Sequence, residues 1–309
     1  MKFLKPKFWN EQKNIFSTIL LPVSLLYKII FFFKKKISVP KKFNIPVICI
    51  GNIYLGGTGK TPLSLLLFEK LKKIRKPVII KKYYKKHKDE HDLIIAKESS
   101  LIVHNTRGDA IRIAENKGFD VALLDDGFQD YTIKKDLNII CFNSRQLIGN
   151  GLVLPAGPLR EDIKSIQRAQ IIVINGRRNK EFEEKIFNIS KNIKIFYSKY
   201  SGVNLEKFKS KKFLAFAGIG NPNNFFELLL ENKLEIKKTF SFPDHYNYKK
   251  KDLEKIIHEA KKNNLEIITT EKDYERIKIY DFKEIKFLRI NLILEDIDKF
   301  TKQILDYLK

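Results

Sequence analysis

The chain has 309 residues, of which 43% are hydrophobic, so it can bury a sizeable core and is not a globally disordered protein. Its 60 Lys and Arg exceed its 36 Asp and Glu by 24, but only ten of the basic residues are arginines. Readers of nucleic acid rely on the guanidinium fork, and no nucleic-acid-binding motif is present, so the composition argues against a nucleic-acid partner. The lysine excess either solvates the surface or attracts an anionic membrane or a polyanionic substrate.

An apolar segment near the N-terminus, residues 15–33, is almost as long as the roughly 20 residues that cross a bilayer. Pro22 and Lys28 interrupt it, and lysines precede and follow it. A spanning helix would send a short basic N-terminus outward, against the positive-inside rule, and no small-residue cleavage site follows as in a secretory signal. The pattern favours a helix lying in the membrane interface, with a buried core helix as the alternative. In the interfacial arrangement, the aromatic residues expected in the apolar layer are Phe8, Trp9, Tyr27 and residues 31–33.

Beyond residue 40, short apolar runs alternate with amphipathic stretches. The runs predict buried strands at 47–50, 78–80, 121–124, 137–142 and 171–174, and helical patterns cover 63–73 and 110–116. This alternation is typical of a mostly parallel sheet flanked by helices. Cys49 and Cys141 each lie inside such a run, which predicts two buried thiols in a reducing compartment and excludes a disulfide scaffold.

A second α/β set begins near residue 213. It predicts strands at 213–217, 234–240 and 266–269, with helices at 223–232 and 250–263. The polar stretch 196–212 precedes this set and is interpreted as a linker. We therefore expect an interfacial helix over 1–40, a core domain over 41–200 and a smaller α/β domain over 201–309.

A glycine-rich loop follows the first predicted strand and precedes a predicted helix. Glycines there allow backbone N–H groups to wrap a phosphate, Lys60 can reach the β/γ oxygens of a nucleotide, and the Thr61 hydroxyl can ligate Mg²⁺. The usual pattern opens with Gly, where this chain has Tyr54, and a chance glycine-rich turn is the alternative. The predicted nucleotide-binding residues are Tyr54, Leu55, Gly56, Gly57, Thr58, Gly59, Lys60 and Thr61.

Paired carboxylates, Asp125 and Asp126, end the predicted strand at 121–124. An acid in this place is what a Walker-B strand supplies to the Mg²⁺ beside a phosphate-binding loop, although Asp-Asp-Gly also forms ordinary turns. Thr61, Asp125 and Asp126 are therefore the predicted metal ligands. No Asn-Lys-x-Asp motif is present, which argues against a GTPase.

These motifs in this order resemble the tetraacyldisaccharide 4′-kinase family. The resemblance covers nearly the whole chain and rests on several segments: Gly51-Asn52, Gly56 to Pro62, Asp125-Asp126-Gly127-Phe128-Gln129, Leu154-Pro155-Ala156-Gly157-Pro158-Leu159-Arg160-Glu161, Ala217-Gly218-Ile219-Gly220-Asn221-Pro222, Phe242-Pro243-Asp244-His245 and Thr270-Glu271-Lys272-Asp273. It implies a kinase with a P-loop NTPase-like fold that uses ATP and Mg²⁺. The implied reaction is phosphorylation of the 4′-hydroxyl of a tetraacylated glucosamine disaccharide 1-phosphate in lipid A biosynthesis. The implied location is the cytoplasmic face of the bacterial inner membrane, on its anionic surface, and no obligate protein partner is evident.

The resemblance also implies roles for individual residues. Asp89 is the expected catalytic base, supported by His245, while Lys60 and Asp126 complete the catalytic set. The expected substrate-binding residues are Arg107, Gln129, Arg160 and Glu161. For the two arginines, a structural ion pair is the alternative.

The chain departs from the family pattern in three places. Lys81-Lys82-Tyr83-Tyr84 stands where the family usually has Ser-Arg-Gly-Tyr, His91 stands in place of a Pro, and Asp130 in place of a His. These departures keep Asp92 open as a substitute for Asp89. They also leave open a P-loop kinase or ATPase acting on another membrane amphiphile. A third hypothesis is a non-catalytic, membrane-anchored protein that binds a nucleotide or a polyanion. The joint presence of Lys60, Thr61, Asp125, Asp126 and His245 argues against it, since binding alone needs no base.

Overall fold

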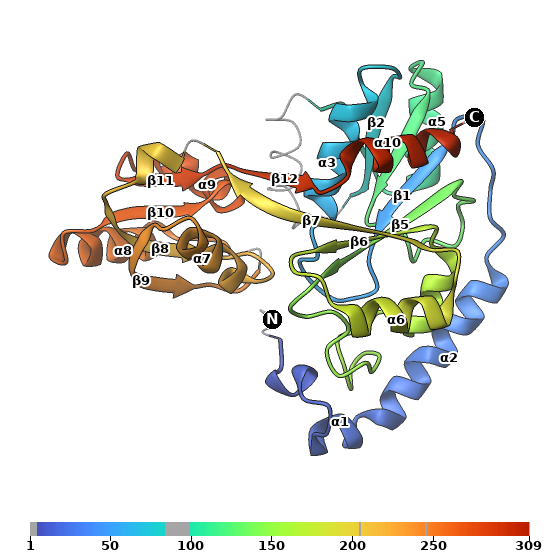
Figure 1. Ribbon diagram of the computed structural model, residues 1–309, viewed down its shortest axis with the longest axis horizontal. Helices are drawn as coiled ribbons and strands as arrows, with labels where there is room; N and C mark the ends of the chain where they lie inside the picture. Colours follow the sequence, from blue (N-terminus) through green and yellow to red (C-terminus); the bar gives the residue numbers. More distant parts are fainter. Residues whose placement is uncertain (1–4, 84–98, 204, 245, 309) are drawn as a thin grey trace. The chain divides into compact units, whose positions relative to one another are not determined.

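The computed structural model describes residues 5–83, 99–203, 205–244 and 246–308 (Figure 1). The described chain forms two compact units. The larger comprises residues 5–83, 99–199 and 293–308, and the smaller comprises residues from 200 to 292. The chain passes from one unit to the other within β7 (Lys194–Gly202) and returns within β12 (Ile290–Leu294).

An eight-stranded sheet with the order β12-β7-β6-β5-β1-β4-β2-β3 contains the strands of the larger unit. Its remaining strands are β1 (Val47–Gly51), β2 (Pro77–Lys82), β3 (Leu101–His104), β4 (Val121–Asp125), β5 (Leu137–Asn143) and β6 (Ile171–Asn175). All pairings from β3 to β7 are parallel. β1 pairs with β4 so that Ile50 lies opposite Asp125. The glycine-rich loop and the paired carboxylates therefore begin at the same edge of the sheet.

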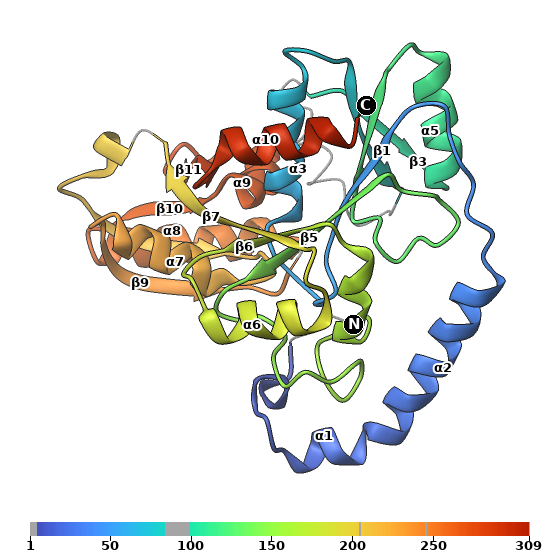
Figure 2. The ribbon, with the colours of Figure 1, turned by 45° about the vertical axis from the view of Figure 1, so that its right-hand side comes forward.

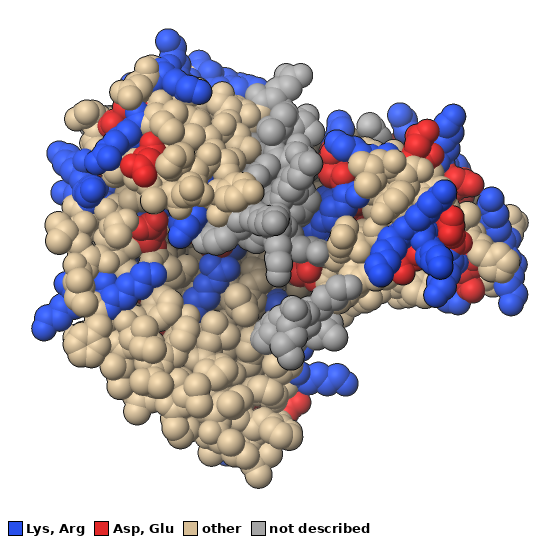
Figure 3. Space-filling view, turned by 180° about the vertical axis from the view of Figure 1, so that it is seen from behind, with Lys and Arg blue, Asp and Glu red and all other residues tan. Residues whose placement is uncertain are grey.

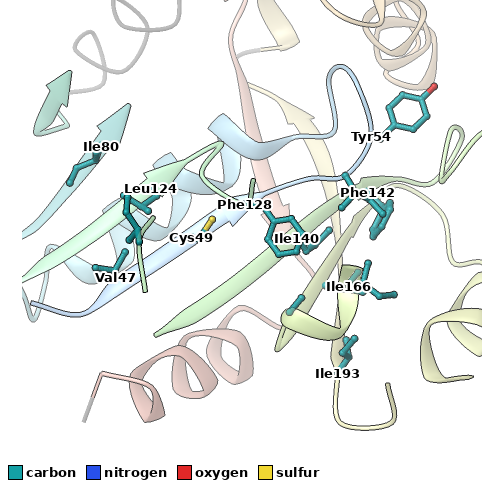
Figure 4. Close-up of a cluster of buried hydrophobic side chains, with 14 of the residues drawn as sticks. Val47, Cys49, Tyr54, Ile80, Leu124, Phe128, Ile140, Phe142, Ile166 and Ile193 are labelled. Carbon is teal, nitrogen blue, oxygen red and sulfur yellow. The ribbon is translucent and has the colours of Figure 1, made fainter. Parts of the chain in front are cut away.

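Helices cover both faces of this sheet. α5 (Arg107–Asn116) and α6 (Lys180–Ile189) pack on the face to which Val47 and Cys49 point, and Figure 4 shows part of this apolar layer. α3 (Lys60–Leu71) contacts β1, β2 and β4, and α10 (Ile297–Asp306) contacts β7 through ring packing of Phe300 on Phe196 at 5.2 Å. Cys49 and Cys141 are buried free thiols, as predicted.

The N-terminal apolar segment is helical but broken. A 3-10 turn, η1 (Lys7–Asn10), precedes α1 (Ile15–Ile19) and α2 (Leu21–Ile37), and Pro22 lies in the first turn of α2, where a proline is tolerated (Figure 2). In the described chain, no helix combines the length and the apolar character needed to cross a bilayer. The expectation that Trp9 lies in an apolar membrane layer is wrong, because its ring is buried in the protein.

The smaller unit has its own four-stranded parallel sheet, ordered β11-β10-β8-β9. Its strands are β8 (Lys212–Ala217), β9 (Glu235–Ser241), β10 (Glu266–Thr270) and β11 (Ile285–Leu288). Its helices are α7 (Pro222–Glu231), α8 (Lys250–Lys262) and α9 (Glu271–Ile277), and the remaining 3-10 turns of the chain are η2 (Ile163–Arg168), η3 (Leu205–Phe208) and η4 (Lys278–Tyr280).

The observed boundaries differ from the predicted ones in two places. Residues 196–202 of the predicted linker, 196–212, belong to the strand β7, which pairs with β6. Its Ser and Lys residues made this stretch look polar, although it also contains Phe and Tyr. The C-terminal residues after β12 belong to the larger unit, because Phe300 and Ile304 of α10 are buried there. Both differences arise from pairing between segments far apart in the sequence.

Candidate functional site

The loop between β1 and α3 has the backbone conformation of an anion-binding loop. Gly59 precedes the first turn of α3 with φ 94°, and Gly56 has φ 128°. Glycine adopts these positive φ angles with little conformational strain, because it has no Cβ. α3 therefore starts at Lys60 and Thr61. The first N–H groups of a helix lack partners within it and carry partial positive charge, so this end of α3 suits a phosphate.

Asn52, at the start of this loop, holds its shape. The buried Nδ2 donates to the carbonyl oxygens of Tyr54 at 2.7 Å and Gly56 at 3.2 Å, and to Thr58 Oγ1 at 3.0 Å. One amide group thus ties three points of the loop together before any ligand binds. The sequence motif contains Asn52, but its role as an internal clamp depends on the folded loop.

At the end of β4, the first carboxylate of the pair joins the loop to β2. Thr61 Oγ1 donates to Asp125 Oδ2 at 2.8 Å, and Lys81 Nζ lies 2.8 Å from the same oxygen. Asp125 and Lys81 are both buried. The sequence analysis predicted Thr61 and Asp125 as ligands of one metal ion, which stays a prediction, and noted Lys81 only as a departure from the family pattern.

Cations surround the second carboxylate, Asp126. Arg160 Nη1 lies 2.9 Å from Oδ1 and 3.1 Å from Oδ2, and Lys60 Nζ lies 3.7 Å from Oδ1. Arg107 Nη2 donates to the backbone carbonyl of Asp126 at 2.6 Å. Burial alone raises the pKa of Asp126, but Lys60 and Arg160, with Arg107, outweigh it and hold the pKa far below its usual range.

Asp126 also has an unusual backbone conformation. Its φ is 62°, in the left-handed region that residues other than glycine seldom adopt. Backbone strain of this kind is concentrated at functional sites, where the surrounding contacts hold it in place. Here the three cations supply such contacts.

The other predicted substrate residues adjoin this cluster. Gln129 Nε2 donates to the Asn52 carbonyl at 2.9 Å, and Arg160 Nη1 donates to Gln129 Oε1 at 3.5 Å. Glu161 Oε2 accepts hydrogen bonds from Tyr131 at 2.7 Å and from Arg168 at 2.6 Å.

Two further side chains orient these groups: Arg168, which the sequence analysis missed, and Asp130, which it noted only as a departure from the family pattern. The Arg168 guanidinium lies 4.1 Å from the centroid of the Phe128 ring, so it is held by stacking as well as by Glu161. Asp130 Oδ2 lies 3.4 Å from Arg107 Nη1, so Asp130 is the acidic partner of that arginine. No local sequence signal predicts either contact, because each joins residues that lie more than twenty positions apart in the chain.

The residues at the loop fit a Mg²⁺ ion held jointly with nucleotide phosphates. Asp125 Oδ1 is a buried oxygen with no hydrogen-bond partner among residues 5–83, 99–203, 205–244 and 246–308, and Oδ2 lies beside Thr61. Within the described residues, no three His, Cys, Asp or Glu side chains gather as a metal cage. Such a cage is not required, because Mg²⁺ at phosphoryl-transfer sites is usually held by one or two carboxylates together with substrate phosphates.

Comparison with known proteins identifies the family. The family model described as Tetraacyldisaccharide-1-P 4′-kinase matches residues 16–309. A tetraacyldisaccharide 4′-kinase of Pelagibacter ubique is 43% identical over 99% of this chain and 98% of its own length, and one of Rickettsia akari is 33% identical over 98% and 97%. The chain belongs to the tetraacyldisaccharide-1-P 4′-kinase family.

A solved structure shares the fold. The crystal structure of LpxK from Aquifex aeolicus in complex with ATP superposes with a TM-score of 0.73, at 26% identity, over 96% of this chain and all of that one. The predicted P-loop NTPase-like α/β fold and the predicted kinase class are thereby confirmed.

The two residues expected to act on the sugar hydroxyl, Asp89 and His245, lie outside the described residues. In the smaller unit, the family segment that ends at Asp273 has a structural role. The buried Asp273 carboxylate accepts hydrogen bonds from the Gly218 N–H at 2.9 Å, from Tyr248 at 3.1 Å and from Arg276 at 2.8 Å. This carboxylate joins two of the segments on which the family resemblance rests.

The N-terminal helices of this family member are inverted in polarity. The buried residues of α1 and α2 are Ser17 and Ser24. Apart from Thr18 and the lysines, most exposed residues of these helices are large and apolar: Ile15, Phe16, Ile19, Leu21, Val23, Leu25, Leu26, Ile29, Ile30, Phe32, Phe33 and Ile37. In Figure 3 this part of the larger unit is a broad tan surface with few charged residues. We call it the α1–α2 surface.

Polar contacts dock these helices on the loop that carries Arg160 and Glu161. Ser24 Oγ donates to the Val153 carbonyl at 2.9 Å and accepts from the Ala156 N–H at 3.0 Å. Trp9 Nε1 donates to the Pro155 carbonyl at 3.0 Å, so the segment before α1 binds the same loop. The apolar surface and the substrate-binding candidates are therefore attached to one another within the larger unit.

Proposed function

We propose that this chain transfers the γ-phosphoryl group of ATP to the 4′-hydroxyl of a tetraacylated glucosamine disaccharide 1-phosphate at a membrane surface. Family membership gives the substrate class. The observation that carries the proposal is the pair formed by Thr61 and Asp125, at 2.8 Å, beside the N-terminus of α3. This is the Walker arrangement that phosphoryl transfer requires.

Within the larger unit, backbone N–H groups of the glycine-rich loop and three cationic side chains are proposed to bind the phosphates and neutralise their charge. The backbone N–H groups from Gly56 to Thr61 wrap the β and γ phosphates, and the Lys60 ammonium neutralises charge that develops during transfer. Arg107 and Arg160 supply guanidinium groups beside Asp126, where they can hold a second anionic group of the substrate.

Thr61 and Asp125 are the residues proposed to hold Mg²⁺, and both have an oxygen suited to it. The ion, when bound, neutralises phosphate charge and fixes the geometry of the transferred group. Both carboxylate oxygens of Asp126 already contact Arg160, so its proposed contribution to the metal site is secondary.

For removal of the hydroxyl proton, Asp89 with His245 remains the proposal from the family resemblance, with Asp92 as the substitute. An alcohol is a weak nucleophile at neutral pH, and a carboxylate within hydrogen-bond reach accepts its proton as it attacks.

The α1–α2 surface is proposed to lie on the cytoplasmic face of the inner membrane. A helix that buries serine and exposes leucine, isoleucine and phenylalanine costs free energy in water, and the apolar layer of a bilayer removes that cost. The lysines at the end of α2, Lys34, Lys35 and Lys36, suit anionic headgroups. An acylated substrate embedded in the same bilayer then reaches the loop that holds Arg160.

The decisive experiment supplies the acceptor directly. The protein is incubated with ATP labelled in its γ-phosphate, Mg²⁺ and tetraacyldisaccharide 1-phosphate in mixed micelles, and the lipid product is located by mass spectrometry. We expect a bisphosphorylated lipid from the parent protein, about a hundredfold less or lower still from Lys60→Ala, and none from an acceptor lacking the 4′-hydroxyl. ATP turnover with another amphiphile, and none with this one, would instead support the alternative kinase.

A further inference from the structure

Lys81 forms a buried ion pair with the proposed metal ligand Asp125. The side chains of Lys81 and Asp125 are only 6% and 1% exposed, and Nζ lies 2.8 Å from Oδ2. The pairing follows from the sheet register, because Ile80 of β2 lies opposite Leu124 of β4 and the next residues along are Lys81 and Asp125. Both partners therefore extend from rigid strands rather than from loops.

The two oxygens of Asp125 have different environments. Oδ2 receives hydrogen bonds from both Lys81 and Thr61, whereas the buried Oδ1 accepts none from the part of the chain that the structure describes. A buried carboxylate without a compensating positive charge is strongly unfavourable. With no metal bound, Lys81 supplies that charge from within the chain.

The neighbouring Asp126 obtains its positive charge differently. Its cations are Lys60, Arg107 and Arg160, which come from α3, α5 and the loop after Leu159, and its side chain is 32% exposed. Asp125 is thus the more deeply buried acid of the pair, and the buried Lys81 accompanies it. The two acids of the motif are held by separate sets of cations.

We propose that Lys81 is a positioning residue that takes the place of the metal's charge on Asp125 when no divalent ion is bound. It neutralises the carboxylate charge, holds Oδ2 beside Thr61 and leaves Oδ1 for the ion. A metal ion must then share Asp125 with an ammonium group, so Lys81 also weakens metal binding and sets the free Mg²⁺ concentration that the site needs. This inference rests on the proposed function, in which Asp125 is a Mg²⁺ ligand.

Thermal unfolding without nucleotide separates this role from simple packing. Lys81→Met removes the charge and retains much of the side-chain length, Asp125→Asn removes the opposite charge, and the double variant removes both. In the presence of a metal chelator, the Lys81→Met variant should unfold at a clearly lower temperature than the parent protein. Added Mg²⁺ should restore much of the lost unfolding temperature. The double variant should unfold at a higher temperature than Lys81→Met and should not respond to Mg²⁺. Lys81→Arg, which keeps the charge, should resemble the parent.

Binding of Mn²⁺ in place of Mg²⁺, measured by electron paramagnetic resonance without ATP, is the second readout. The Lys81→Met variant should bind Mn²⁺ about tenfold more tightly, or better, than the parent protein. The variant lacks the ammonium group that repels a cation bound to the same buried carboxylate. Unchanged or weaker Mn²⁺ binding would overturn the proposal. So would a stability loss that neither Mg²⁺ nor the Asp125→Asn change relieves.

The same measurements distinguish failure of this inference from failure of the proposed metal site. If Asp125→Asn abolishes Mn²⁺ binding while Lys81→Met leaves it unchanged, the metal site stands and the role of Lys81 is refuted. If Mn²⁺ binding survives Asp125→Asn, the metal assignment fails and this inference fails with it. Should Lys81→Met not fold, the double variant and Lys81→Arg still decide the question, because only a charge-based role predicts that both fold.

Discussion

Replacing exposed apolar residues of the α1–α2 surface should release the protein from membranes without unfolding it. Leu25, Phe32 and Phe33 are 60%, 61% and 53% exposed, so little of their packing within the protein is lost on substitution. The triple change to serine is preferred to deletion of the segment, because deletion also removes the buried Trp9.

The magnitude follows from the exposed fractions. Burying a whole leucine or phenylalanine side chain is worth about 1.5–3 kcal/mol, so the exposed portions contribute about 1–2 kcal/mol each when they enter the apolar layer. The three together are worth about 3–5 kcal/mol, which is about a hundredfold to several-thousandfold in the partition coefficient.

Vesicle sedimentation at fixed ionic strength measures this partition. A matched control replaces Ile74 and Ile279, which are 57% and 77% exposed outside the α1–α2 surface, with serine. The control should bind vesicles like the parent, and both variants should keep the parent's unfolding temperature. If the triple variant still sediments as well as the control, this surface does not bind the membrane and the reasoning fails.

Three further outcomes are expected. Lys60→Ala should lower turnover about a hundredfold or more while the circular dichroism spectrum stays unchanged, because charge stabilisation is lost at the phosphates; near-normal turnover would make the glycine loop structural. Because the pKa of Asp126 lies far below its usual range, its contribution to stability is complete above its unfolded pKa of about 4 and is lost only as pH falls below that value. Asp126→Asn should therefore lower the urea midpoint at neutral pH and do so progressively less in acid; a cost independent of pH would contradict the ionic role. Burial raises the pKa of the Cys49 thiol to about 11 and also raises that of Cys141. Neither thiol should therefore react with a disulfide reagent at neutral pH until the protein is unfolded. Rapid labelling of the native protein would show that the core is open.

The sequence by itself determined the features that depend on short stretches of chain. The apolar runs predicted β1, β4 and β5 to within a residue or two, because strands buried on both faces need continuous apolar residues. The glycine-rich loop between β1 and α3 was equally predictable, since its conformation depends on glycines within a few residues of one another. Family membership followed from the order of such motifs.

Only the tertiary structure decided which distant groups meet. It places Lys81 beside Asp125, because two strands far apart in the chain are neighbours in the sheet. The tertiary structure also decides which face of α2 is buried. The sequence shows an apolar helix with one serine in its first turns. Only the docked helix shows that Ser24 faces inward, where it hydrogen-bonds with the backbone of the loop from Val153 to Ala156. Hydrophobic periodicity assumes that apolar side chains point to the protein core. At a surface that is proposed to lie on a bilayer, the favourable side for those residues is the outside.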